Sequence, residues 1–224
     1  MNKGLLIVID GIDGSGKTTQ IEFLSKYFQE KSIPFEVISF PRYQENEYGK
    51  LVKRYLEGEF GAINKVDPYW IAEAYAADRL LAKPEIENWL QNGKLIIANR
   101  YVSASKAHLG ANLDESKRED FIKWVDQLEY QTNGMPKPDL VILLNVDPKM
   151  GQENALKAHL TDIHEKSLEH EEKAAQIYLE LSQSEKNWVV INCMENDKMN
   201  PEEKIHREIL KILSKARALR ALKV

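Results

Sequence analysis

The residues from Gly11 to Thr18 have the types and the spacing of a loop that binds phosphate. They read Gly-Ile-Asp-Gly-Ser-Gly-Lys-Thr and match the pattern G-x-x-x-x-G-K-[ST] at every position. Its glycines can adopt backbone angles that other residues avoid, so that successive N–H groups can point at phosphate oxygens. Lys17 can reach the terminal phosphates, and the Thr18 hydroxyl is placed for Mg²⁺. The loop predicts a phosphate-bearing ligand but does not decide which reaction follows.

Two arginines follow other apolar runs of the chain and indicate a second anionic ligand. Arg42 comes after the second run and Arg100 after the third, and arginine forks match phosphate oxygens bidentately. Tyr75 and Arg79 are four residues apart, hence on one helix face, and Tyr101 follows the second arginine. A tyrosine ring offers a face on which a base or a sugar packs. Surface ion pairs of little consequence are the alternative for each arginine alone, but together these residues favour phosphoryl transfer to an acceptor nucleotide.

The elements that must position these residues are short apolar runs rich in β-branched residues. Because the runs do not alternate with polar residues, they are typical of strands buried on both faces. The segments between them have helical periodicity, which predicts a parallel sheet flanked by helices, an α/β fold of the P-loop NTPase type with ligands beyond the carboxyl ends of the strands. The five predicted strands are residues Gly4–Ile9, Phe35–Phe40, Leu95–Ala98, Leu140–Val146 and Trp188–Ile191.

Several helix boundaries can be predicted from capping residues. Asp67 followed by Pro68 is typical of a helix start, and we expect that helix to end or restart at Pro84. A later helix should begin after Asp114 and end near Gly134.

The stretch from Gly151 to Ser184 is polar, has helical propensity and carries His159, His164 and His170. A metal site is one interpretation, but spacings of five and six residues do not place the histidines on one helix face. A solvated, mobile segment is the favoured interpretation. Over a phosphate site, such a segment can act as a lid that excludes water.

Composition is typical of a folded protein that works in a reducing compartment. The chain has 224 residues, 43% hydrophobic and 29% charged, which suits one domain over 1–224. A net charge of −4 argues against a nucleic-acid partner. Cys193 is the single cysteine and is expected to be a buried thiol without a disulfide. The apolar runs are too short to span a membrane and no signal peptide is evident, so we expect a cytoplasmic protein.

Over essentially its whole length the sequence resembles the thymidylate kinases, P-loop kinases that phosphorylate dTMP with ATP. The matching segments are Asp10 to Thr19, Phe40 to Arg42, Ala77 to Arg79, Asn99 to Tyr101, Pro136 to Leu140 and Val146 to Pro148. Together these segments are far more specific than a P-loop alone.

The resemblance implies five parallel strands, a helical lid at about residues 150–172, ATP with Mg²⁺, and a homodimer. By position, the ATP-binding residues are Gly11, Ile12, Asp13, Gly14, Ser15, Gly16, Lys17, Thr18 and Thr19. The acceptor-binding residues are Asp13 at the sugar, Arg42 and Arg100 at the phosphate, Arg79 at the base edge, Tyr75 stacked on thymine and Tyr101 against the deoxyribose.

Two departures from the family pattern affect the expected chemistry. Asn99 stands where the family usually has Asp, so we assign the metal to Thr18 and Asp10. The family also places a catalytic arginine in the P-loop or on the lid, but the P-loop here has Gly14 and the lid region has no arginine. Lys157 is our candidate to replace it. The expected catalytic residues are therefore Lys17, Arg42, Arg100 and Lys157.

Three functional hypotheses remain from sequence. The first is a dTMP kinase, and the second is a kinase for another pyrimidine nucleotide such as dUMP, UMP or CMP, or for a deoxynucleoside; arginines at the acceptor site count against an acceptor without phosphate. The third is a nucleotide-binding protein with weak or no catalysis, which Asn99 and the arginine-free lid would explain. All three take small-molecule nucleotides as partners.

Overall fold

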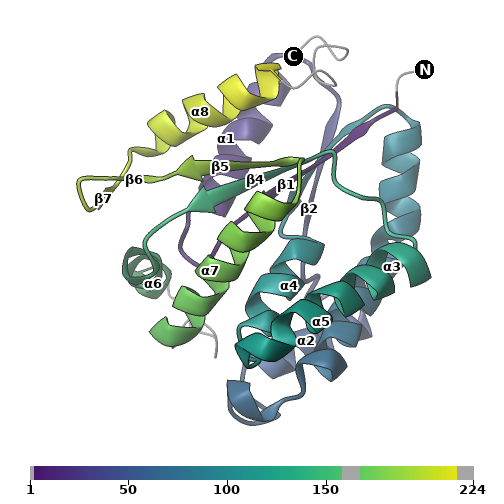
Figure 1. The fold of residues 1–224 in the computed structure, drawn as a ribbon. Coiled ribbons are helices and arrows are strands. Elements are labelled where there is room, and N and C mark those ends of the chain that lie inside the picture. The colour runs from purple at the N-terminus through teal and green to yellow at the C-terminus, as the bar shows by residue number, and fades with distance from the viewer. Residues whose placement is uncertain (1–2, 158–166, 216–224) are drawn as a thin grey trace.

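A computed structural model describes residues 3–157 and 167–215, and a five-stranded parallel sheet is its centre (Figure 1). The strands lie in the order β2-β3-β1-β4-β5, and every neighbouring pair is parallel. The strand bounds are β1 Leu5–Asp10, β2 Phe35–Ser39, β3 Leu95–Asn99, β4 Leu140–Asn145 and β5 Trp188–Asn192. All five predicted strands are confirmed, with ends that differ by one residue at most.

Helices cover both faces of this sheet (Figure 1). One face packs on α1 and α8 and the other on α3, α4, α5 and α7, with α2 packed on α3. The bounds are α1 Lys17–Glu30, α2 Glu47–Leu56, η1 Ile63–Lys65, α3 Pro68–Gln91, α4 Val102–Gly110, α5 Glu115–Asp126, η2 Gln127–Thr132, α6 Pro148–Lys157, α7 Leu168–Ser184 and α8 Glu202–Lys215, and a small hairpin pairs β6 Met194–Glu195 with β7 Lys198–Met199.

The continuous hydrophobicity of β1 follows from its place in the middle of the sheet. All six residues of β1 are buried, and alternate side chains enter two separate cores. Leu6 and Val8 belong to the core under α3, α4 and α7, whereas Ile7 and Ile9 belong to the core under α1 and α8. A polar side chain on either face would lie in an apolar layer, so the strand has no alternation.

The prediction that a helix ends or restarts at Pro84 is wrong, because α3 continues to Gln91. Pro84 is exposed on the outer face of the helix, so its ring meets solvent instead of the core. The carbonyl that loses its hydrogen bond belongs to Leu80, which is also exposed, and water can satisfy it. Ile86 and Leu90 hold the second half of the helix through their burial on the inner face.

The expectation of a solvated segment from 151 to 184 is also wrong for most of its described part. Residues 158–166, which include His159 and His164, lie outside the described residues. Within α7, apolar side chains such as Ile177 and Leu181 are buried in the core beside α4, and His170 is only 4% exposed. Polar composition concealed this because most charged residues of α7, such as Glu172 and Glu180, occupy the other face of the helix.

Cys193 is a buried free thiol, as predicted, and burial raises its pKa to about 12. Its Sγ lies 3.6 Å from the carbonyl oxygen of Ile191. A thiol with this pKa is protonated at neutral pH and hence a poor nucleophile. Among the helices of the described residues, none has the length and hydrophobicity needed to cross a membrane.

Candidate functional site

The turn between β1 and α1 has the backbone geometry that phosphate binding needs. Gly11 has φ 144° and Gly14 has φ 68°, both in the region that favours glycine. Gly16 precedes α1 in a left-handed conformation and has no side chain with which to cap the helix. The first N–H groups of α1 therefore have no side-chain cap from Gly16 and can bind an anion, helped by the positive end of the helix dipole.

Lys17 lies folded back inside this turn. Its Nζ donates to the carbonyl oxygen of Gly11 at 3.0 Å and to that of Ile12 at 2.7 Å. Burial, followed by the charge of Arg100, lowers the pKa of Lys17 to about 8. In this conformation the ammonium group is occupied by carbonyl oxygens of the loop itself, so contact with a phosphate would require the side chain to move.

Arg100 is attached directly to the same turn. It follows β3 with φ 63°, and its guanidinium forms an ion pair with the Asp13 carboxylate and donates to the carbonyl oxygen of Gly11 at 3.3 Å. Burial alone would raise the pKa of Asp13, but the charges of Arg100 and Lys17 outweigh it and hold that pKa below its usual value. The structure thus brings Lys17 and Arg100, two predicted phosphate-binding residues, to one place.

Arg42 is held at the end of β2 by a carboxylate of α3. Its Nε donates to Asp78 Oδ1 at 3.1 Å, its backbone N–H to Asp78 Oδ2 at 2.9 Å, and its Nη2 to the Asp78 carbonyl at 2.8 Å. Nη1 forms an ion pair with the exposed Glu45 at 3.2 Å. Asp78 itself is 1% exposed, so it is a rigid support that sets the direction of the arginine. Sequence reasoning did not assign it any role.

The structure places Arg79 away from any exposed surface. The side chain is 1% exposed, and its Nε and Nη2 donate to Glu129 Oε1 at 2.8 and 2.5 Å. Nη2 also donates to the Ser105 hydroxyl at 2.8 Å, and Nη1 to the carbonyl of Tyr101 at 3.4 Å. The expected contact with a base edge is therefore not available in this conformation, because the guanidinium is buried among these protein partners.

The placement of Tyr101 also corrects our expectation. Its ring is 0% exposed and packs on Phe40, and its hydroxyl donates to the Pro136 carbonyl at 3.0 Å. A ring in the core cannot contact a deoxyribose, and its position next to Arg100 in the sequence gave no sign of this. Tyr75 is half-buried and packs against the same core, so it retains surface for a ligand.

The residues considered as metal ligands differ in burial and in hydrogen bonding. Asp10 is fully buried, and its two oxygens accept hydrogen bonds of 2.6 Å from the hydroxyls of Ser103 and Tyr178. Thr18 is exposed in the first turn of α1. Asn99 ends β3, and its buried Oδ1 has no hydrogen-bond partner among the described residues. An oxygen in this state fits the preference of Mg²⁺ for oxygen ligands or for water held by them.

The absence of a side chain at Gly14 lets α6 lie directly on the P-loop. A Cβ at this position would lie 1.9 Å from the carbonyl oxygen of Gly151, and one at Gly151 would lie 2.7 Å from that of Asp13. Asn154 donates from its amide to the Gly14 carbonyl at 3.2 Å. Lys157 is the last residue of α6 and is exposed.

The first turn of α7 contributes residues that sequence reasoning did not assign to the site. Glu171 Oε2 accepts the backbone N–H of Asp13 at 3.2 Å. Burial, and then the negative charge of Asp13, raises the pKa of Glu171 to about 8. His170 is buried beside His108 of α4, and burial lowers the pKa of His170 to about 4. The paired His and Glu were visible in the sequence, but nothing indicated which helix face they would occupy.

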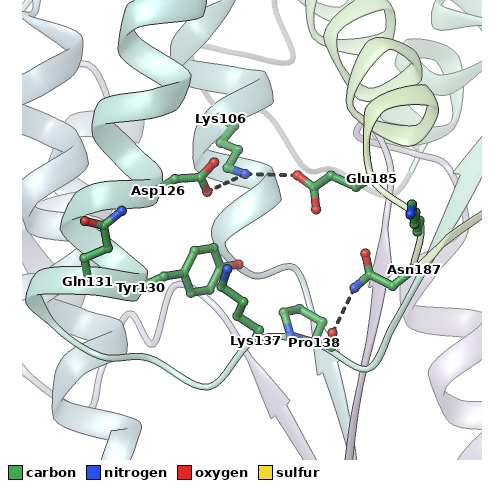
Figure 2. Close-up of a pocket in the computed structure, with 9 residues that line it drawn as sticks. Lys106, Asp126, Tyr130, Gln131, Lys137, Pro138, Glu185 and Asn187 are labelled. Atoms are coloured by element: carbon green, nitrogen blue, oxygen red, sulfur yellow. Dashed lines mark hydrogen bonds and ion pairs between the residues drawn. The ribbon is translucent and has the colours of Figure 1, made fainter.

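A polar cavity of about 630 Å³ is separate from this site (Figure 2). Pro138 and Asn187 line it just before β4 and β5, so it lies by the amino ends of these strands, whereas the P-loop follows the carboxyl end of β1. The buried Lys106 bridges Asp126 at 2.5 Å and Glu185 at 3.2 Å. These ion pairs join α4 to the ends of α5 and α7, which is a structural role.

Comparisons with known proteins agree with the geometry. The family model described as thymidylate kinase matches residues 9–209. The thymidylate kinase of Mycobacterium tuberculosis (strain ATCC 25618 / H37Rv) is 29% identical over 184 residues, which cover 80% of this chain and 86% of the relative. The probable thymidylate kinase of Pyrococcus horikoshii is 32% identical over 216 residues, which cover 94% and 96%.

A solved structure extends the likeness to the fold. The thymidylate kinase of Candida albicans superposes with a TM-score of 0.77 over 97% of this chain and 94% of its own, at 22% identity. At this identity the likeness shows the shared sheet and helix arrangement.

Proposed function

The chain belongs to the thymidylate kinase family, and we propose that its site transfers the terminal phosphoryl group of ATP to dTMP, giving dTDP and ADP. The observation that carries this proposal is the ion pair between Arg100 and Asp13. It joins an arginine suited to the acceptor's phosphate to the loop that binds the donor's phosphates. Two phosphate-binding elements in contact are what an in-line transfer between two nucleotides requires.

The reaction needs positioning and charge, not a covalent intermediate. Lys17 would swing from its backbone contacts to the transferring group, while the N–H groups at the start of α1 hold the other phosphates. Arg100 and Arg42 would bind the phosphate of the acceptor, with Arg42 aimed by Asp78. These cations spread the negative charge that develops during transfer.

Magnesium belongs to this proposal. When bound with the nucleotide, Mg²⁺ would supply positive charge that offsets the negative charge of the phosphates. Thr18 would hold it directly, and the buried Oδ1 of Asn99 is suited to a ligand or to one of its waters. Asp10, with its hydrogen bonds to Ser103 and Tyr178, would act through water.

The alternative acceptors receive less support. Every relative described above carries the name thymidylate kinase, and the family assignment makes the chain an ATP-dependent nucleoside monophosphate kinase. Arg79 is the predicted base reader, and its burial with Glu129 leaves base recognition to residues such as Tyr75.

The remaining expectations are also proposals. We propose one domain over 1–224 with a lid at about 150–172, of which α6 and the start of α7 are described. We propose a homodimer that uses the exposed apolar side chains of α3, since Trp70 is 44% and Leu81 54% exposed. Leu81→Glu should then shift the sedimentation coefficient to that of a monomer. A cytoplasmic location is supported by the free thiol of Cys193.

The test is a coupled assay for ADP release with ATP, Mg²⁺ and a panel of dTMP, dUMP, UMP, CMP and thymidine. We expect dTMP to give the highest turnover, and activity no greater than the acceptor-free background would refute the proposal. Arg42→Ala should raise the KM for dTMP about tenfold or more and leave the KM for ATP nearly unchanged, because it removes a charge-assisted contact to one substrate.

Arg54 provides the matched control for this substitution. It is an exposed arginine of α2 that forms an ion pair with Glu59 at 2.7 Å. Arg54→Ala should leave both KM values unchanged. Equal losses of ATP and dTMP affinity in Arg42→Ala would show that Arg42 is not an acceptor residue.

A further inference from the structure

The guanidinium of Arg100 pairs with Asp13 through Nη2 and has a further side-chain contact at Nη1. Its Nη1 lies 2.8 Å from Nε2 of His108, which lies on α4 and is 7% exposed. A guanidinium group can only donate hydrogen bonds, so Nε2 of His108 must accept. His108 is therefore neutral at this contact and carries its proton on Nδ1.

The donor and acceptor roles of the next residues follow from the same reasoning. Nδ1 of His108 lies 3.4 Å from Nε2 of His170, so His170 accepts there and carries its own proton on Nδ1. That Nδ1 lies 3.0 Å from the amide oxygen of Asn112, which can only accept. Nδ2 of Asn112 in turn donates to the hydroxyl of Tyr55 at 3.4 Å. These four hydrogen bonds thus run in one direction, away from Arg100.

We propose that His108 and His170 are positioning residues for Arg100, two neutral imidazoles that hold its guanidinium against the P-loop by a one-directional chain of hydrogen bonds. This inference rests on the proposed role of Arg100 at the acceptor's phosphate. A carboxylate at position 108 would support the guanidinium but would add a second negative charge beside that of Asp13. Neutral imidazoles hold the guanidinium without adding to the negative charge of Asp13.

The chain also ties Arg100 to α7. His170 supports the arginine through His108, and the next residue, Glu171, accepts the backbone N–H of Asp13. The first turn of α7 is therefore linked to both partners of this ion pair, to Asp13 directly and to Arg100 through His108. The pKa of His170, lowered to about 4 by burial, keeps its ring neutral over the range in which kinases work.

A metal site is the competing interpretation, because ligand atoms of His108, His170 and Glu171 lie within 4.8 Å of one another. The contact with Arg100 disfavours it. While Nε2 of His108 accepts from the guanidinium, Nδ1 carries a proton and cannot bind a cation. A metal at Nδ1 would need the other tautomer, whose N–H would point at the guanidinium and displace it.

The tautomers of His108 and His170 provide the first test, which does not depend on enzyme activity. Long-range ¹H–¹⁵N spectra of protein labelled at its five histidines should show Nδ1–H, not the usual Nε2–H, for His108 and His170. Signals are assigned from His108→Gln and His170→Gln. The Nε2–H tautomer at either position in an active enzyme would overturn the inference while leaving the proposed function intact. Stoichiometric Zn²⁺ that shifts both signals in the wild type would also overturn it.

Kinetics provide the second test. His108→Ala should raise the KM for dTMP about tenfold, because Arg100 loses its support, with the KM for ATP unchanged. His108→Gln should recover most of this loss, since a glutamine oxygen can accept where Nε2 did. His206→Ala is the control, as that ring packs on Phe23 of α1. Equal effects on both substrates, without recovery by Gln, would indicate a merely structural histidine.

Binding of dTMP without ATP, measured by calorimetry, separates the two proposals. Wild-type protein that binds dTMP but does not phosphorylate it would defeat the proposed function. In that case a weaker affinity of His108→Ala for dTMP would still support the positioning role, and an unchanged affinity would refute it. Failure of the wild type to bind dTMP would overturn both.

Discussion

Glu171 is a buried carboxyl group whose charge state is expected to affect the stability of the protein. It is 1% exposed, one oxygen accepts the Asp13 N–H, and the other has no hydrogen-bond partner among the described residues. Its pKa is raised from 4.5 to about 8, chiefly by burial. Because the folded-state pKa is the higher one, Glu171 contributes stability that is complete below pH 4.5 and is lost as the pH rises through 8.

The perturbation that isolates this effect is Glu171→Gln, which keeps the shape and the acceptor but cannot ionise. The difference between the folded and unfolded pKa values of Glu171 lowers the free energy of unfolding by at most about 5 kcal/mol above pH 8. About 2 to 3 kcal/mol of this loss falls between pH 5 and pH 7. The variant should therefore gain about 2 to 3 kcal/mol relative to the wild type as the pH rises across that interval. Other titrating groups largely cancel because both proteins carry them.

Urea denaturation followed by circular dichroism at pH 5, 6, 7 and 8 measures this difference without adding salt. Glu169→Gln is the control, since Glu169 lies on the same turn but is exposed and forms an ion pair with Lys173. Its difference from the wild type should not change with pH, because an exposed ion pair contributes little to stability. If Glu171→Gln gives a difference that does not grow with pH, Glu171 is ionised in the folded protein and the reasoning fails.

Three further predictions concern the P-loop, the buried ion pair and the lid. Gly14→Ala should cost about 1 to 2 kcal/mol of stability because of its left-handed backbone, and more because the new Cβ would collide with Gly151. Gly61→Ala is the control: its φ is 101° and no atom lies nearer than 3.9 Å, so it should show the backbone cost alone. Equal losses of stability in thermal denaturation would contradict the close packing of α6 on the P-loop. Arg79→Met and Glu129→Met should each lower the free energy of unfolding by about 3 to 5 kcal/mol, because each leaves a buried charge without its partner. The double variant should lose much less than the sum of the two, so additive losses in a double-mutant cycle would contradict the buried pair. Lys157→Ala should lower kcat more than it raises the KM for dTMP, with Lys149→Ala at the other end of α6 as the control; an unchanged kcat would remove Lys157 from the mechanism.

Local pattern was enough to predict the sheet and its active edge. Strands β1, β3, β4 and β5 have buried residues on both faces, so an unbroken apolar run marks each of them, whereas the edge strand β2 buries only Ile38. The glycines of the P-loop are required by a local turn. Arg100 could be predicted for the same reason, because parallel strands bring their carboxyl ends to one edge. These features depend on residues close in sequence or on a regular sheet.

Contacts between distant helices were not predictable in this way. Arg79 is a plausible ligand residue by type, but Glu129, 50 positions later, decides that it is buried and neutralised. Tyr101 is next to Arg100 and yet faces the core. In both cases the sequence shows a functional group without showing what lies opposite to it.

By itself, the sequence determined the phosphate loop, the order of strands and helices along the chain, and the family, since each follows from short-range patterns. Only the tertiary structure decided which charges remain available for chemistry. Arg100 pairs with Asp13 and is also held by His108 of α4, Arg42 is held by Asp78, and Arg79 is buried against Glu129. The physical reason is that the free charge of a buried cation depends on its partners, and packing alone brings those partners together.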